Sequence, residues 1–377
     1  MIPVNEPLLG EKESEYVRDC IASGWISSRG SYIDAFEKRF SEYCGTAHGI
    51  TTTNGTTALH LALLTLGIGP GDRVILPTFT MAATAFAVLY TGAVPVLVDV
   101  DPETGNIDPL KVKDILDQAK IGGEKTIRAL LPVHIYGHPV DMDPLKELAR
   151  EYDLLIIEDA AEAHGAEYKG KKTGGLGDMG CFSFYANKII TTGEGGMVVT
   201  NHPDWAERAR SLKDLAHAKD QRFLHFEIGF NFRMTNLQAA LGLAQLERIE
   251  EFLQKKQWMA RAYAERLKDM EGVRLPVEKP WAQNVYWMYG ILIDQPFPLK
   301  RDAFARELSA RQIETRNFFV PMHRQPVMQP FINTPFAFRA ADYWADHGLY
   351  LPSGLAITES QIDQVCEAIR ALENRKK

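Results

Sequence analysis

Cysteine is scarce in this sequence of 377 residues, and its four cysteines are widely separated (Cys20, Cys44, Cys181 and Cys366). Zinc sites and disulfide frameworks need thiols at short, regular spacing, such as CxxC. We therefore expect no metal site and no disulfide. A reducing compartment such as the cytoplasm is the simplest setting for such a chain.

Runs of basic residues are also missing. The formal net charge is −7, and Lys and Arg are dispersed among acidic residues. Because binding to a nucleic-acid backbone needs a concentrated basic surface, we expect no nucleic acid partner. Small phosphorylated ligands need only a few donors, so the charge does not exclude them.

The sequence lacks an apolar run that predicts a membrane span. Residues 74–98 carry no charge, but Pro77, Gly92 and Pro95 interrupt them, which favours a strand, a helix and a second strand. The first residues, MIPVNEPLLGEKESEY, are acidic where a signal peptide is basic and then apolar. We expect a cytoplasmic protein with no membrane partner.

Short apolar segments alternate with helical patterns between about residues 47 and 200. The predicted strands are DRVILP (72–77), VPVLVDV (94–100), IRALLPVHI (127–135), DLLIIED (153–159) and MGCFSFY (179–185). The predicted helices are NGTTALHLALLTLG (54–67), TMAATAFAVLYTG (80–92) and DMDPLKELAREY (141–152). This alternation, with strands that are nearly continuously apolar, predicts an α/β fold with a mostly parallel central sheet flanked by helices.

The last third of the chain has a different pattern. From Asn236 to about Met270 there is no proline and a single glycine, and apolar residues recur at helical spacing, which predicts one long helix. Beyond it, VYWMYGILID (285–294) predicts a strand, and RDAFARELSARQ (301–312) and ESQIDQVCEAIRALEN (359–374) predict helices. We therefore predict a large α/β domain of residues 1–250 and a smaller α+β domain of residues 251–377.

Three polar side chains lie where predicted strands end. Asp159 ends DLLIIED, His134 lies near the end of IRALLPVHI, and Lys188 follows MGCFSFY. Parallel sheets bind ligands beyond the carboxyl ends of their strands, so chemistry is expected at these positions. Lys188 lies between an apolar strand and the turn GEGG, where desolvation would leave part of its amine unprotonated and nucleophilic. The alternative for Lys188 is a solvent-exposed lysine in a loop.

Neighbouring motifs favour the nucleophile. NGTT (54–57) predicts a helix start whose amides and hydroxyls bind an anion, although an ordinary helix cap would also explain it. Asp159 either pairs with a buried cation or caps the segment that follows it. Ser183 either binds the same anion or is only a strand residue. Pyridoxal phosphate needs a lysine for its aldehyde, an acid for its pyridinium nitrogen and donors for its phosphate, so the combination predicts this cofactor.

Six motifs spread over nearly the whole chain resemble one protein family. They are WISSRG (25–30), NGTTAL (54–59), EDAAEAHGA (158–166), SFYANKIITTGEGG (183–196), GFNFRMTNLQAA (229–240) and VPMH (320–323). Together they resemble the sugar nucleotide aminotransferases of the DegT/DnrJ/StrS type, and NKIITTGEGGM with GFNFRMTNLQAA is the most specific pair. The resemblance implies a pyridoxal phosphate-dependent aminotransferase of fold type I.

The resemblance assigns roles to residues that match the family motifs. It implies that Lys188 binds the aldehyde of the cofactor and that Asp159 pairs with the pyridine nitrogen. The residues that it assigns to the phosphate are Thr56, Thr57 and Ser183.

The motif GFNFRMTN carries a further implication. Asn231 resembles an asparagine that reaches the phosphate from a neighbouring subunit, which implies a homodimer with active sites at the subunit interface. The alternative is a structural loop in which Arg233 caps a helix. His134 and His323 would be able to approach the sugar or the cofactor, although each is more often a structural histidine.

Two positions depart from the common family pattern. Met81 stands where many members place an aromatic ring over the cofactor, and a thioether covers a ring face less firmly. Phe79 is nearby but out of register. Glu162 stands where a glutamine near the phenolic oxygen is common, and a carboxylate there repels a phenolate unless it is protonated or turned toward the substrate. Lys188 itself disfavours related dehydratases, which have histidine at this position.

The expected reaction moves an amino group from L-glutamate to the 4-keto group of a nucleotide-linked 4-keto-6-deoxyhexose. The resemblance favours GDP-4-keto-6-deoxymannose, which would give GDP-perosamine for a surface polysaccharide such as an O antigen. The alternatives are a UDP- or dTDP-linked keto sugar, amination at the 3-position, and a non-catalytic regulator that binds a sugar nucleotide. A nicotinamide-dependent oxidoreductase would need GxGxxG after an early strand, whereas GIGPGD (67–72) precedes one.

Overall fold

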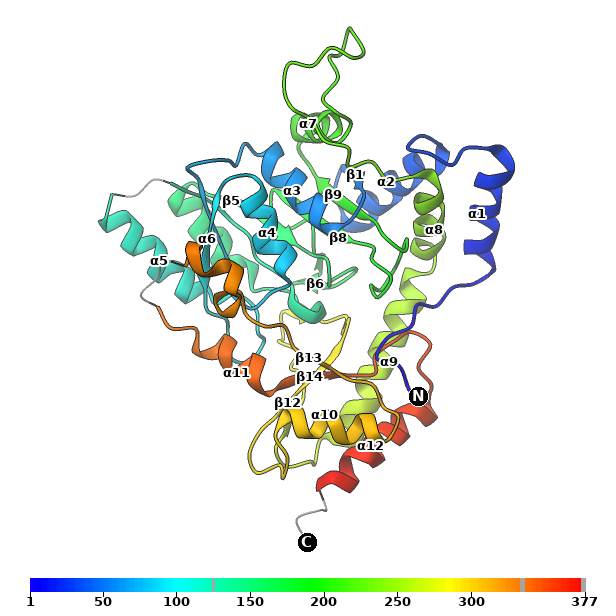
Figure 1. Ribbon diagram of the computed structural model, residues 1–377, viewed down its shortest axis with the longest axis vertical. Coiled ribbons are helices and arrows are strands. Elements are labelled where there is room, and N and C mark those ends of the chain that lie inside the picture. Colours follow the sequence, from blue (N-terminus) through cyan, green and yellow to red (C-terminus); the bar gives the residue numbers. More distant parts are fainter. Residues whose placement is uncertain (124–125, 333–335, 374–377) are drawn as a thin grey trace.

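A seven-stranded sheet organises the larger part of the chain (Figure 1). The computed structural model describes residues 1–123, 126–332 and 336–373. Within these residues the sheet has the order β1 (His48–Thr52), β9 (Gly196–Thr200), β8 (Met179–Ser183), β5 (Leu155–Asp159), β4 (Ile127–Leu130), β2 (Arg73–Pro77) and β3 (Val94–Val98). Neighbours from β3 to β8 are parallel, whereas β9 is antiparallel to both β8 and β1. The predicted mostly parallel α/β sheet is confirmed.

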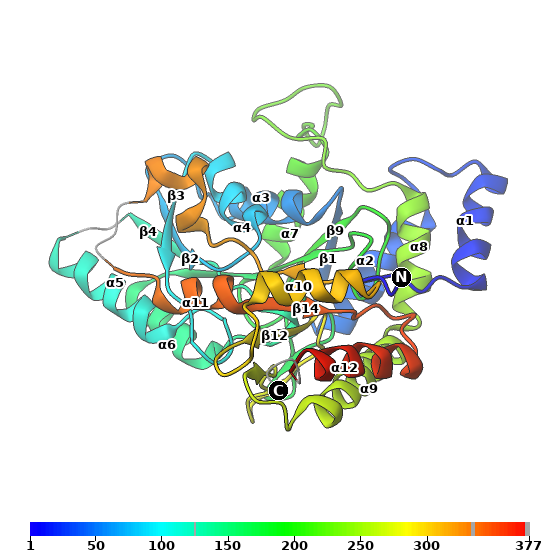
Figure 2. The ribbon, with the colours of Figure 1, turned by 60° about the horizontal axis from the view of Figure 1, so that its bottom comes forward.

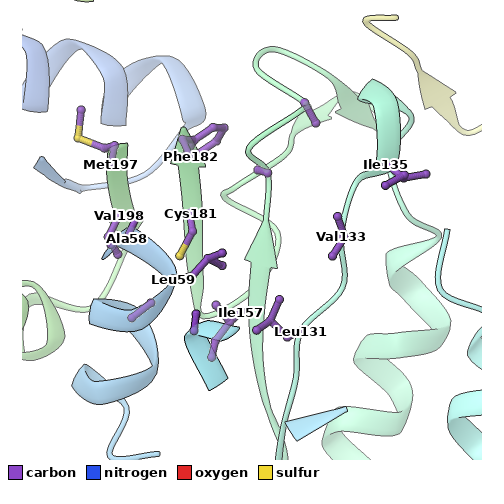
Figure 3. Close-up of a cluster of buried hydrophobic side chains, with 14 of the residues drawn as sticks. Ala58, Leu59, Leu131, Val133, Ile135, Ile157, Cys181, Phe182, Met197 and Val198 are labelled. Atoms are coloured by element: carbon purple, nitrogen blue, oxygen red, sulfur yellow. The ribbon is translucent and has the colours of Figure 1, made fainter. Parts of the chain in front are cut away.

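Helices cover both faces of this sheet because successive strand residues point to opposite sides. Val74 and Leu76 of β2 belong to an apolar cluster that includes residues of α3 (Gly55–Thr65), α4 (Ala82–Tyr90) and α7 (Pro203–Lys213). Ile75, between them, belongs to a second cluster with residues of α5 (Pro109–Ile121) and α6 (Met142–Tyr152). Figure 3 shows part of the first cluster, where Leu59 of α3 lies near Ile157 of β5.

The connection between β8 and β9 determines where Lys188 lies. The two strands are consecutive and antiparallel, so residues 184–195 return the chain at the carboxyl end of β8. β5 runs parallel to β8, with Asp159 opposite Cys181, so both strands end at the same edge of the sheet. The turn that contains Lys188 is therefore brought to the strand end that carries Asp159.

A smaller antiparallel sheet forms the lower part of the molecule in Figure 1. Within the described ranges its order is β10 (Val273–Arg274), β12 (Tyr289–Ile293), β14 (Gly348–Leu351) and β13 (Arg316–Asn317). A separate apolar cluster joins this sheet to α9 (Ile249–Leu267), α10 (Arg301–Ala310) and α12 (Glu359–Glu373). α9 and α12 lie side by side (Figure 2). Residue 374, the last of the predicted terminal helix, lies outside the described residues, and the domain division at 250/251 stays a prediction.

The remaining elements are the N-terminal helices, α8 and several shorter helices and strands. α1 (Glu11–Ser23) and α2 (Ser31–Cys44) pack against α8 (Asn236–Leu246). The shorter elements are β6 (Glu167–Tyr168), β7 (Lys171–Lys172), β11 (Ala282–Gln283), α11 (Arg339–His347), and the 3₁₀ helices η1 (Ile135–Gly137), η2 (Met322–Arg324) and η3 (Pro326–Phe331). A helix with the length and apolar character of a membrane span is not found in the described part of the chain.

The prediction of one long helix from Asn236 to about Met270 is wrong, because α8 and α9 are separate. The residues between them are held by charges from the N-terminal helices. Glu247 binds Lys12 and Arg39, and Arg248 binds Glu13. Pairing with a distant part of the chain leaves no local signal, and a two-residue break hardly disturbs the apolar spacing.

Candidate active site

A cavity of about 490 Å³ lies at the carboxyl ends of β5 and β8. One wall comes from the start of α3 and the turn between β8 and β9, and the other from segments at β12, β13 and β14. Its polar and aromatic lining consists of Asn54, Thr56, Thr80, Asp159, Glu162, Ser183, Tyr185, Asn187, Lys188, Glu194, Trp287, Arg316, Phe319 and Tyr350.

The side chain of Lys188 points into this cavity and is 11% exposed. Its Nζ lies 4.0 Å from the carboxylate of Glu162 and 3.8 Å from the centre of the Trp287 ring. Burial lowers the pKa of Lys188, and the carboxylates of Glu162 and Asp159 partly oppose that shift. A lowered pKa leaves more of the amine unprotonated near neutral pH, as a nucleophile requires.

Asp159 is the last residue of β5 and is buried. Its carboxylate accepts hydrogen bonds from the hydroxyl of Thr84 at 2.7 Å and from the amide of Ala161 at 3.2 Å. Burial raises the pKa of Asp159, while these two donors lower it. Asp159 thus presents a buried carboxylate to the cavity, where a cation would stabilise it. Its hydrogen bond to the amide of Ala161 also stabilises the turn after β5.

Glu162 is the second buried carboxyl group in the cavity. It accepts a hydrogen bond from the amide of Tyr136 at 2.8 Å. Burial raises the pKa of Glu162, and the charge of Lys188 opposes this shift. An acid with a raised pKa thus lies beside an amine with a lowered pKa, so the protonation of one group affects the pKa of the other.

The start of α3 lies at the wall of the same cavity. Asn54 caps the helix by accepting from the Thr57 amide at 2.9 Å, and the first amides of a helix have no acceptor within it. Gly55 allows the helix to approach β8, because a Cβ there would lie 2.7 Å from the Cβ of Ser183. Thr56 and Ser183 therefore line the cavity together, whereas the hydroxyl of Thr57 donates to Asn54 O at 2.8 Å and lies outside the lining.

Of the two side chains near α4 that were considered for the ring face, Met81 lines the cavity and Phe79 does not. Met81 immediately precedes α4, lines the cavity and is 53% exposed. Phe79 is fully buried and packs against Tyr136 and Trp344, away from the lining. Met81 therefore lines the cavity together with Thr80 and Ala83 of the same segment, and its role over a cofactor stays a prediction.

Neither candidate histidine reaches the cavity lining. His134 is fully buried, with Nε2 3.0 Å from Glu158 and Nδ1 accepting from the Val140 amide at 3.0 Å. His323 lies between the hydroxyl of Thr78 at 2.8 Å and the carboxylate of Asp342 at 2.9 Å. Both have structural partners, which agrees with the structural alternative.

Asn231 lies outside the cavity of its own chain. It is exposed, and its side-chain oxygen accepts from Arg233 Nε at 3.0 Å. Thr235, and not Arg233, caps the start of α8, whereas Arg233 binds Asp214 at the end of α7, so the alternative of a structural loop is not contradicted. The prediction that Asn231 serves a neighbouring subunit is not tested within one chain and stays a prediction.

Several cavity residues were not identified from the sequence, and three of them come from the smaller sheet or the segment before it. Trp287 comes from the segment before β12, Arg316 from β13 and Tyr350 from β14, where Arg316 and Tyr350 are paired. Their segments show only strand patterns, and packing of the smaller sheet brings them to the cavity. No local motif would have identified them.

Comparisons with known proteins agree on the kind of protein. A sequence model of the DegT/DnrJ/EryC1/StrS aminotransferase family matches residues 7–370. The chain is 44% identical over 370 residues to a GDP-perosamine synthase of Caulobacter vibrioides, covering 98% of this chain and 97% of that protein. A GDP-perosamine synthase of Vibrio cholerae is 40% identical, with 98% of each chain covered. The solved structure of DesV from S. venezuelae superposes with a TM-score of 0.89 at 35% identity, covering 96% of this chain and 94% of that one.

Proposed function

The chain belongs to the DegT/DnrJ/EryC1/StrS aminotransferase family, and on that premise we propose that it is a pyridoxal phosphate-dependent enzyme that forms an amino sugar nucleotide. The donor is L-glutamate and the acceptor is GDP-4-keto-6-deoxymannose, aminated at the 4-position to GDP-perosamine. The identity to two GDP-perosamine synthases carries this choice of substrate. We place the reaction in the cytoplasm, in the synthesis of a surface polysaccharide.

The chemistry of the cavity supports this cofactor. Its donors at the start of α3 and at Ser183 suit a phosphate, and the buried carboxyl group of Asp159 suits a cationic ring nitrogen. Lys188 supplies an amine whose pKa is lowered by burial. An anion site, a buried acid and a nucleophilic amine in one cavity are the groups that pyridoxal phosphate requires.

We assign the following roles to residues of this chain. When bound, the cofactor carries the amino group between donor and acceptor and withdraws electrons from the reacting carbon. Lys188 holds the aldehyde through Nζ and, once released, moves a proton at the reacting carbon. Asp159 keeps the proton on the ring nitrogen. Thr56 and Ser183 bind the phosphate, and Thr57, whose amide and hydroxyl both bond to Asn54, stabilises the helix start that carries Thr56.

Two further side chains complete the proposed cofactor site. Met81 covers one face of the ring, and its thioether adapts to that surface. Glu162 would serve the phenolic oxygen, because its raised pKa favours a protonated carboxyl that would donate a hydrogen bond to it. A protonated Glu162 would not repel the phenolic oxygen, whereas an ionised Glu162 would.

A homodimer with shared active sites is part of the proposal. The loop between α7 and α8 extends away from the rest of the chain (Figure 1). It exposes several large apolar side chains, namely Phe223, Leu224, Phe226 and Ile228. Exposed apolar groups of this size favour burial against a partner. Asn231 lies in the same connection, and we assign it to the cavity of the partner that covers these apolar side chains.

The acceptor is tested by supplying the purified enzyme with pyridoxal phosphate, L-glutamate and a panel of GDP-, UDP- and dTDP-linked 4-keto sugars. We expect 2-oxoglutarate and an amino sugar in amounts that match, with the GDP-linked sugar preferred. Products are identified by mass spectrometry and NMR. If no sugar of the panel is aminated, the proposed function is wrong, and preference for another nucleotide would overturn only the choice of acceptor.

The lowered pKa of Lys188 predicts how cofactor capture depends on pH. Only the unprotonated amine attacks an aldehyde, so the rate should rise with pH and level off above the pKa of Lys188. Because burial lowers this pKa, the midpoint should lie below 10.5, the ordinary value for lysine. Stopped-flow absorbance of the apoenzyme mixed with pyridoxal phosphate measures it. A midpoint at the ordinary value would contradict the lowered pKa.

Arg316 is expected to bind an anionic part of the substrates. Lys188 and Arg316 are the Lys and Arg side chains of the described cavity lining, and the guanidinium of Arg316 is 58% exposed, 3.5 Å from Glu314. L-Glutamate and a sugar nucleotide both carry anions, and a charge-assisted hydrogen bond contributes about 1.5–3 kcal/mol. Arg316→Met should therefore lower kcat/KM about tenfold or more, mainly through KM. Arg311→Met, which breaks the pair with Glu307 on α10, is the control.

Mixing two inactive variants tests the shared active site. If Asn231 acts in the partner's cavity, a hybrid of Lys188→Ala and Asn231→Ala subunits has one site with both changes and one site with neither. Random exchange of subunits should then restore about a quarter of wild-type activity. If each subunit used its own Asn231, the mixture would stay as inactive as its components.

A further inference from the structure

A buried lysine outside the cavity is not used by the proposed chemistry. Lys256 of α9 is 2% exposed, and burial lowers its pKa to about 7. Its Nζ donates to the carbonyl of Trp287 at 2.9 Å and to the carbonyl of Ser353. No charge of a described residue offsets this burial. Burying an amine has a cost in free energy. We therefore expect the role of Lys256 to lie in the two carbonyl groups that it binds.

Trp287, whose carbonyl accepts a hydrogen bond from Lys256, contacts both Lys188 and the residue before it. Its indole N–H donates at 2.7 Å to the carbonyl of Asn187, the residue before Lys188. Its ring face lies 3.8 Å from Lys188 Nζ. The position of Trp287 therefore affects both the backbone and the amine of Lys188.

The backbone around Trp287 is irregular and depends on support from α9. Tyr286 has a φ of 47°, a left-handed conformation that side-chain-bearing residues rarely adopt. Two consecutive residues of α9 bind this segment. Gln257 donates to the carbonyl of Asn284, and Lys256 donates to that of Trp287. Residues 284–287 are thus held against α9 on both sides of the irregular position.

We propose that Lys256 is a positioning residue, which holds the carbonyl of Trp287 and thereby sets the place of the indole and of the Lys188 amine. The inference rests on the proposed function, in which Lys188 is the reacting amine. The nitrogen of Lys256 donates hydrogen bonds whether or not it is protonated, so the contact persists while Lys188 titrates.

The test compares Lys256→Met with Lys255→Met. Lys255 is a half-buried lysine of the same helix, with Nζ 4.1 Å from the centre of the Trp258 ring, outside the network of Trp287. The first readout is the rate at which the apoenzyme captures pyridoxal phosphate at Lys188, trapped by borohydride reduction. The second is the rate of Lys188 methylation by formaldehyde and cyanoborohydride, read by peptide mass spectrometry. Both are measured well below the unfolding temperature.

We expect Lys256→Met to slow both reactions of Lys188 about tenfold or more, because small displacements of a reacting group cost large factors in rate. Lys255→Met should react within about twofold of wild type. A merely structural Lys256 would lower the unfolding temperature and leave both rates at Lys188 unchanged in the folded protein, and this result would overturn the proposal.

Trp287→Phe provides an independent arm, because it removes the indole donor and keeps an aromatic ring. It should slow both reactions of Lys188 about as much as Lys256→Met does. The variant that carries both changes should react no more slowly than the slower of the two single variants. Additive effects, or a Trp287→Phe variant that reacts as wild type, would overturn the proposal. If Lys256→Met does not fold, Lys256→Gln takes its place in the cycle and is judged by the same outcomes.

The two readouts separate this inference from the proposed function. A wild-type protein that captures no pyridoxal phosphate would contradict the proposed cofactor. The methylation rates would still decide whether Lys256 positions the amine of Lys188. Capture by wild type and by Lys256→Met at equal rates would overturn the positioning role alone.

Discussion

Replacing Lys188 with alanine is expected to abolish amino-group transfer, with a loss of about 10⁴-fold or more. The variant loses both the amine that holds the cofactor aldehyde and the group that moves the proton. No other lysine of the described residues lines the cavity, so none is placed to substitute. The measurement is release of 2-oxoglutarate from L-glutamate, together with the visible spectrum before and after glutamate is added.

The control for this variant is Lys171→Ala, which removes an exposed lysine of β7. It should retain wild-type rates and the wild-type spectrum. Lys188→Ala should still fold, because the side chain makes no hydrogen bond with the described residues beyond its approach to Glu162 and Trp287. A variant that kept more than a few per cent of the wild-type rate would show that Lys188 is not the reacting amine.

The second large effect is expected from Asp159→Asn. The amide is nearly the same shape but carries no charge to keep a proton on the ring nitrogen, and removing one partner of a buried charge pair costs about 3–5 kcal/mol. Such a loss corresponds to a fall in kcat of about 10²- to 5 × 10³-fold. Single-turnover reaction of the loaded enzyme with L-glutamate measures it. A loss of less than about fivefold would remove Asp159 from the proposed role.

Glu158→Gln is the matched control, because Glu158 precedes Asp159 on β5 but points to the other side. Its carboxylate accepts from the amides of Gly174, Leu176 and Gly177 at 2.6–2.8 Å and pairs with His134. In Glu158→Gln, the side-chain NH₂ group would face these backbone N–H groups without an acceptor between them. We expect this to lower the free energy of unfolding by about 3–5 kcal/mol. We expect a lower unfolding temperature, with the rate of the folded protein reduced much less than in Asp159→Asn.

The strand ends were the part of the site that the sequence predicted best. Asp159, Ser183 and Lys188 are close together because β5 and β8 are parallel neighbours, and apolar strand patterns with polar ends are visible in the sequence. The start of α3 was predictable for a similar reason, since NGTT has the residues of a helix cap. Local patterns therefore located the half of the cavity that belongs to the large sheet.

The other half depends on contacts that have no local pattern. Trp287 and Arg316 reach the cavity because the smaller sheet packs over it, and the sequence of that sheet shows only alternation. Lys256 looks like one more polar position of a helix, although it is buried. The break between α8 and α9 was missed for the same reason, because long-range charge pairs determine it. Such features follow from tertiary packing and not from propensity.

The pairing of β1 with β9 constrains the order in which the chain assembles. His48 pairs with Thr200, and α3 begins just after β1, so the helix start meets its partner Ser183 only when much later residues have joined the sheet. Closing so large a loop has an entropic cost that precedes any gain in contacts, which makes this step slow. During synthesis on the ribosome, the start of α3 is made early, before β8 and β9 are available to complete the cavity. If the proposed cofactor binds there, it would find a complete site only late in folding, and it should stabilise the finished sheet without guiding its first steps.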